Sequence, residues 1–117
     1  MTPHLLRVCI ENTLALIAER DAQLHYQAQS PGLDVSTELF LQWEDWYRPR
    51  SPEFLDAFDA SEASTLRAFH AIFTDVRNDV FETVPSIAQF VETAAWRRIS
   101  DAARATQALL RSALKAA

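Results

Sequence analysis

The stretch DASEASTLRAFHAIFTDVRNDV, residues 59–80, decides the fold class, because it predicts an amphipathic helix more clearly than any other segment. Asp59 and Glu62 have the spacing of a capping box at its start, and Val84-Pro85 ends it. Its apolar residues alternate spacings of three and four, which places them on one helical face; they are Leu66, Phe69, Phe73, Val76 and Val80. This face is expected to pack against a core.

The segments before this helix also predict helices. Thr2 and Pro3 are a typical N-cap and first helical residue, and that helix is expected to run to Gln29, ahead of Ser30-Pro31-Gly32. A second helix begins at Asp34 or Ser36.

The second helix carries most of the aromatic residues near the middle of the chain. Leu39, Trp43 and Trp46 share one face and are assigned to the core. Phe40, Glu44 and Tyr47 lie elsewhere around this helix, where they can be exposed. Ser51-Pro52 opens a short helix.

The segments after residue 85 predict two more helices. A short one covers residues 86–92, and Thr93 caps the last one. The apolar stripe of the last helix consists of Trp96, Ile99, Ala103, Leu110 and Leu114. The chain is therefore expected to be all-α, a single bundle over residues 1–117 with three long and two or three short helices.

Composition supports this fold class and excludes several kinds of site. The 117 residues include one glycine, Gly32, so no Gly-rich phosphate loop or dinucleotide fingerprint can be present. The one cysteine, Cys9, rules out an internal disulfide and a multi-cysteine zinc site, and its place on an apolar stripe indicates a buried thiol. Among the histidines, His70 lies beside the core stripe, where a packed ring is expected.

Charge is distributed unevenly along the chain. The net charge is −5, but residues 34–82 carry eleven acids and four arginines, whereas residues 83–117 carry a net charge of +3. An acidic surface repels phosphate and favours a basic partner, so direct nucleic-acid binding is disfavoured. We find no signal peptide and no run of about 18 apolar residues, which predicts a cytoplasmic location without a membrane span.

The acidic middle supplies the candidate partner-binding residues, with Tyr47 as a possible aromatic anchor. They are Glu44, Asp45, Tyr47, Asp56, Asp59, Glu62, Asp75, Asp79 and Glu82. Asp75, Asp79 and Glu82 share a helical face directed away from the core stripe. This face can be a solvated surface, a protein-binding surface or a metal site. Because paired histidine or cysteine ligands are missing, we expect no metal and no cofactor.

Arg20 and His25 provide an alternative, enzymatic interpretation. Arginine, four residues and histidine resemble the RNase motif of HEPN domains, which are also small helical bundles. The resemblance implies that arginine and histidine converge on a phosphate across a dimer, where arginine stabilises charge and histidine moves a proton. The match lies in the first predicted helix, whereas that family usually carries the motif late in the bundle.

Three segments resemble another group of small acidic helical proteins. They are the run Trp43-Glu44-Asp45-Trp46-Tyr47, the helix segment 66–71, and residues 84–90 leading into Ala95-Trp96-Arg97-Arg98. Over residues 35–105 these segments resemble the immunity proteins of contact-dependent growth inhibition. The resemblance implies a non-enzymatic cytoplasmic inhibitor that binds a cognate toxin domain, often a basic nuclease. A regulatory helical adaptor without a toxin is the third interpretation, and the oligomeric state stays open.

Overall fold

The computed structural model describes residues 1–80 and 86–116, with side chains described to residue 112. This part of the chain contains seven helices and no strand, which confirms the all-α prediction. The helices are α1 (Pro3–Ala18), α2 (Arg20–Gln29), α3 (Val35–Trp46), α4 (Pro52–Ala57), α5 (Ala60–Asp79), α6 (Ile87–Phe90) and α7 (Ala94–Ala116).

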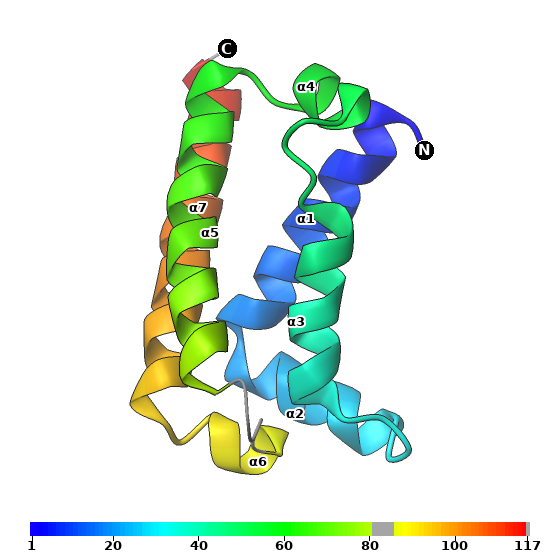
Figure 1. The fold of residues 1–117 in the computed structure, drawn as a ribbon, viewed down its shortest axis with the longest axis vertical. Helices are drawn as coiled ribbons and strands as arrows, with labels where there is room; N and C mark the ends of the chain where they lie inside the picture. The colour runs from blue at the N-terminus through cyan, green and yellow to red at the C-terminus, as the bar shows by residue number, and fades with distance from the viewer. Residues whose placement is uncertain (81–85, 117) are drawn as a thin grey trace.

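Four of the helices form the body of the bundle. α5 packs along α7, α7 along α1, and α1 along α3. In Figure 1, α5 lies in front of α7 and α3 in front of α1, so the helices form two layers. α4 packs against α1 near the N-terminus, while α2 and α6 lie together at the opposite end.

Aromatic side chains fill the space between α3 and α5. The Trp43 and Phe69 rings meet edge to face with centroids 4.7 Å apart, and Phe40 meets Phe73 in the same way at 5.5 Å. All four residues are buried. The prediction that Phe40 can be exposed is therefore wrong. The core face of α3 was assigned from Leu39, Trp43 and Trp46 alone, whereas α1, α5 and α6 cover a wider face of this helix.

The predicted helix starts are confirmed where the structure shows their hydrogen bonds. Thr2 and Ser51 each accept a hydrogen bond from the backbone N–H three residues later. Asp59 and Glu62 form the complete capping box, in which each side chain bonds the other residue's backbone. Thr93 accepts from the Trp96 N–H at 3.1 Å. Val84-Pro85, the expected end of α5, lies outside the described residues.

The prediction of one helix from Pro3 to Gln29 is wrong, because the chain breaks at Glu19. Glu19 has an extended backbone (φ −115°, ψ 113°) that separates α1 from α2. The side-chain amide of Gln23 then donates to the carbonyls of Leu16 and Ile17, at 3.1 and 2.9 Å. A buried glutamine therefore satisfies the carbonyl groups that end α1, where a continuous helix would have used backbone N–H groups.

Candidate protein-binding surface

The described acidic candidates come from α3, α4, α5 and the segments joining them; in Figure 1, α3 and α5 form the front layer and α4 lies at the end near the N-terminus. Glu44, Asp45, Asp56, Asp59, Asp75 and Asp79 are exposed. Their surroundings differ, so they are not equally available to a partner.

Three of these carboxylates have no partner among the side chains that the structure describes. Among the side chains of residues 1–80 and 86–112, no ion pair or side-chain hydrogen bond involves Asp45, Asp56 or Asp79. Asp59 is exposed but holds the start of α5 as its N-cap. Asp45, Asp56 and Asp79 are therefore the acids whose charge is most available to a basic partner.

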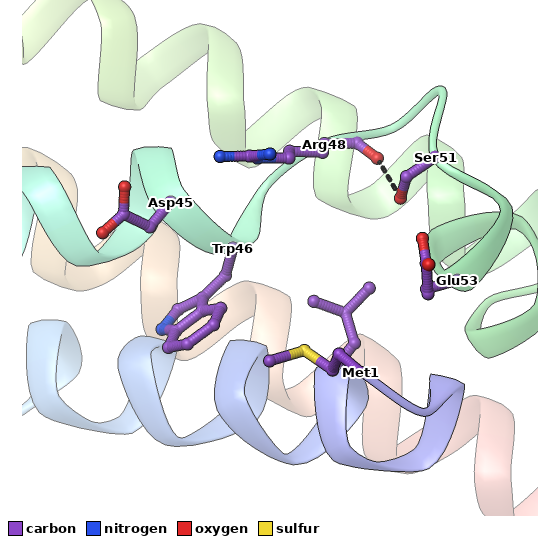
Figure 2. A pocket seen from close by; sticks show the side chains of 7 residues that line it. Met1, Asp45, Trp46, Arg48, Ser51 and Glu53 are labelled. Carbon is purple, nitrogen blue, oxygen red and sulfur yellow. Dashed lines mark hydrogen bonds between the residues drawn. The ribbon is translucent and has the colours of Figure 1, made fainter.

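Asp45 also lines a groove between the N-terminal end of α1, the end of α3 and α4. The groove has a volume of about 420 Å³ and is lined by Met1, Leu6, Asp45, Trp46, Arg48, Ser51 and Glu53. Figure 2 shows Asp45 and Glu53 toward its two ends, with Trp46 and Met1 along one wall. The groove thus combines apolar walls with charges of both signs.

Two of the candidates are paired across helices. The Glu44 carboxylate accepts from Arg77 at 2.9 Å and so links α3 to α5. Asp75 pairs with Arg98 of α7 at 3.0 Å. Both pairs are partly exposed, so water screens them and each contributes little to stability. Glu82, the third member of the predicted acidic face on α5, lies outside the described residues.

Glu62 belongs to the interior, contrary to its assignment to the surface. It is 7% exposed, and its carboxylate lies 2.5 Å from Arg7 of α1. Arg7 also donates to the carbonyl of Ala57 and to Glu11. The hydrogen bond from Arg7 to Glu62 is the main cause that raises the pKa of the arginine. The sequence showed Glu62 as a capping residue but gave no sign that α1 would place an arginine beside it.

Tyr47 lies within an aromatic cluster and is partly buried. Its ring stacks on Trp43 and on His70, with centroid distances of 5.0 and 4.5 Å. Burial raises the pKa of the phenol, and Arg67 opposes this. Tyr47 is therefore only partly exposed and is less prominent than the aromatic anchor that the sequence suggested.

His70 has a specific partner that the sequence pattern did not reveal. The predicted ring packing is present, and in addition the Trp43 indole N–H donates to His70 Nδ1 at 3.1 Å. Burial lowers the pKa of His70, while the nearby Glu44 carboxylate raises it by a smaller amount. Donor and acceptor are 27 residues apart, so no local sequence motif predicts the contact and only the packed structure shows it.

The residues of the alternative RNase motif lie on α2. Arg20 forms an ion pair with Glu92, and His25 is exposed. Five positions along a helix correspond to about 140° of rotation, so the two side chains leave α2 in different directions. Within one chain, α2 does not present them together on one face.

In the described part of the chain, no group of three or more histidine, cysteine, aspartate or glutamate side chains could hold a metal ion. Among the described residues, no helix is long and apolar enough to cross a bilayer.

Cys9, expected to be buried, is partly exposed.

Comparison with known proteins yields no relative. No protein-family model matches the chain, no curated protein sequence matches it, and no solved structure matches its fold.

Proposed function

We propose that this chain is a non-enzymatic immunity protein that binds and blocks a basic toxin domain, of which a nuclease is the expected type. The observation that carries this proposal is the segregation of charge. Residues 34–80 hold ten acidic side chains and four arginines and build α3, α4 and α5. Residues 86–112, on α6 and α7, hold two acids and four arginines.

We infer that this segregation makes the side formed by α3, α4 and α5, which we call the acidic side, more acidic than the layer that contains α7. α3 and α5 form the front layer in Figure 1, and α7 lies behind α5. A field of one sign steers an oppositely charged protein toward that side and raises the association rate by about 10- to 1,000-fold. A nuclease binds phosphate through basic side chains. An acidic surface can compete with the nucleic acid for those same side chains.

The acidic surface is also held in a fixed shape. α3 and α5 are connected by the Glu44–Arg77 pair and by the aromatic cluster beneath it. A surface that is ordered before binding loses less conformational entropy when the complex forms. Inhibition by covering an active site needs no catalytic group on the inhibitor.

The proposal is tested by capture and protection. The tagged chain is recovered from its native cell, and the protein retained with it is identified and expressed alone in a test host. We expect that partner to stop growth, and co-expression of this chain to restore it. A retained partner that is harmless to the host would contradict the immunity function and favour the adaptor interpretation.

A further inference from the structure

His70 and Trp43 form a contact that is a hydrogen bond only while the histidine ring is neutral. An indole N–H can only donate, so His70 Nδ1 must accept, and the neutral ring carries its proton on Nε2. Nε2 lies 3.5 Å from the Thr74 hydroxyl on the same helix. The neutral form of His70 thus fits its surroundings.

A protonated His70 does not fit these surroundings. Protonation at Nδ1 places two donors opposite each other at the distance of the present hydrogen bond. Trp43 is wholly buried, so its N–H has no water to bond instead. A buried donor without an acceptor is costly, and the contact is therefore expected to open when the ring is charged.

This contact lies at the junction of α3 and α5, beside the aromatic contacts and the Glu44–Arg77 pair that also join the two helices. The two backbones approach each other little, and side chains make the connection. The His70 ring stacks on Tyr47, which in turn meets Phe54 of α4 edge to face at 5.6 Å. Displacement of the ring would therefore disturb α3, α4 and α5 together.

The charged and titratable groups around the ring are few. From α3, Glu44 favours the protonated form, and Tyr47 is neutral with a raised pKa. On α5, Arg77 is engaged by Glu44, and Arg67 acts on Tyr47. The Glu44 carboxylate thus interacts with Arg77 as well as with His70. Burial therefore remains the dominant influence on the pKa of His70.

We propose that His70 is a pH-sensitive latch that holds α3 against α5 while the ring is neutral and releases them when it is protonated. The latch is a property of the free chain and does not depend on the proposed toxin partner. Its effect is to make the fixed shape of the acidic side dependent on pH.

The direction of the pH dependence follows from the lowered pKa. The unfolded chain has the ordinary histidine value of 6.5, so between the two pKa values it binds more protons than the folded chain. The contribution of His70 to stability is therefore complete above about pH 6.5 and is lost as the pH falls through the folded-state pKa.

The first test follows the histidine and tryptophan side chains of the full chain by NMR during a pH titration. We expect His70 to titrate below the ordinary histidine pKa of 6.5, with the Trp43 indole N–H resonance shifting at the same midpoint. The Trp96 indole N–H, which is bonded to Gln23, serves as the internal control and should not follow. A Trp43 resonance that stays constant through the His70 titration would overturn the proposal.

The second test compares denaturant midpoints at about pH 7.5 and about pH 5.5, above the range where ordinary carboxylates titrate. His70→Asn keeps a short acceptor but cannot titrate. Its denaturant midpoint should therefore fall, between the higher and the lower pH, by less than half as much as the midpoint of the wild type. His25→Asn should behave like the wild type. If His70→Asn is as acid-sensitive as the wild type, the latch is absent.

Discussion

The Trp96 indole N–H donates a 2.9 Å hydrogen bond to the side-chain oxygen of Gln23, 73 positions earlier in the chain. Gln23 is wholly buried, and its amide nitrogen bonds the last carbonyls of α1. One side chain therefore connects the end of α1, the body of α2 and the start of α7. These hydrogen bonds lie beside the sharp turn at Glu19 that separates α1 from α2.

Gln23→Leu is expected to destabilise the chain by at least about 2 kcal/mol, since it removes the side-chain partner of two carbonyls of α1 and of the Trp96 indole N–H of α7. Urea denaturation measures the loss. Gln29→Leu, an exposed change of the same type on the same helix, should alter stability by less than about 0.5 kcal/mol. Equal effects of the two changes would show that the Gln23 network does not stabilise the fold.

Phe73→Ala is expected to cost about 3–5 kcal/mol, because it empties a buried site that contacts Phe40 and Trp43. The matched control is Leu55→Ala, at a leucine of α4 that is 64% exposed, with an effect below about 0.5 kcal/mol. Thermal and denaturant unfolding report both values. An unchanged midpoint for Phe73→Ala would show that α5 directs its aromatic face to solvent.

Arg7→Met is expected to cost about 3 kcal/mol, because it leaves the Glu62 carboxylate buried without its cation. Arg98→Met removes the exposed pair with Asp75 and should cost at most about 1 kcal/mol. The double variant Arg7→Met, Glu62→Met should recover part of the loss, since no buried charge then remains. A double variant less stable than Arg7→Met would contradict this account of the pair.

The purified chain is expected to leave RNA intact, because α2 directs Arg20 and His25 to different sides and Arg20 is paired with Glu92. The measurement is cleavage of a labelled RNA under conditions in which a known RNase is active. His4→Ala is the control, since His4 is also exposed. Cleavage abolished by His25→Ala but retained in His4→Ala would establish the enzymatic alternative.

Sequence periodicity was sufficient to predict the fold class and most helix starts. The stripe from Leu66 to Val76 is buried as expected, and the Asp59–Glu62 capping box is formed. These features are local, because spacing along one helix and hydrogen bonds over three residues determine them.

Features that depend on contacts between distant helices could not be predicted in this way. The break at Glu19 lies beside a buried glutamine with a partner in α7. The interior position of Glu62 depends on Arg7, 55 positions away. The same limitation applies to the candidate surface, since the sequence identified its acids but not which of them are paired within the chain.

The central claim is that the unpaired acids on α3 and α5 attract a basic toxin domain, and charge reversal tests it. Asp45→Lys with Asp79→Lys changes the net charge from −5 to −1, and lysine near the end of each helix also suits the helix dipole. Asp21→Lys with Asp101→Lys, on α2 and α7, makes the same change of net charge elsewhere.

The deciding measurement is the association rate of each variant with the partner retained in the capture experiment, at low and high salt. We predict that Asp45→Lys with Asp79→Lys slows association at least about tenfold at low salt, and that this defect shrinks as the Debye length falls from about 30 Å at 0.01 M to about 3 Å at 1 M. The control on α2 and α7 should slow association much less. Equal association rates for the two double variants would contradict the claim that this acidic side binds the toxin.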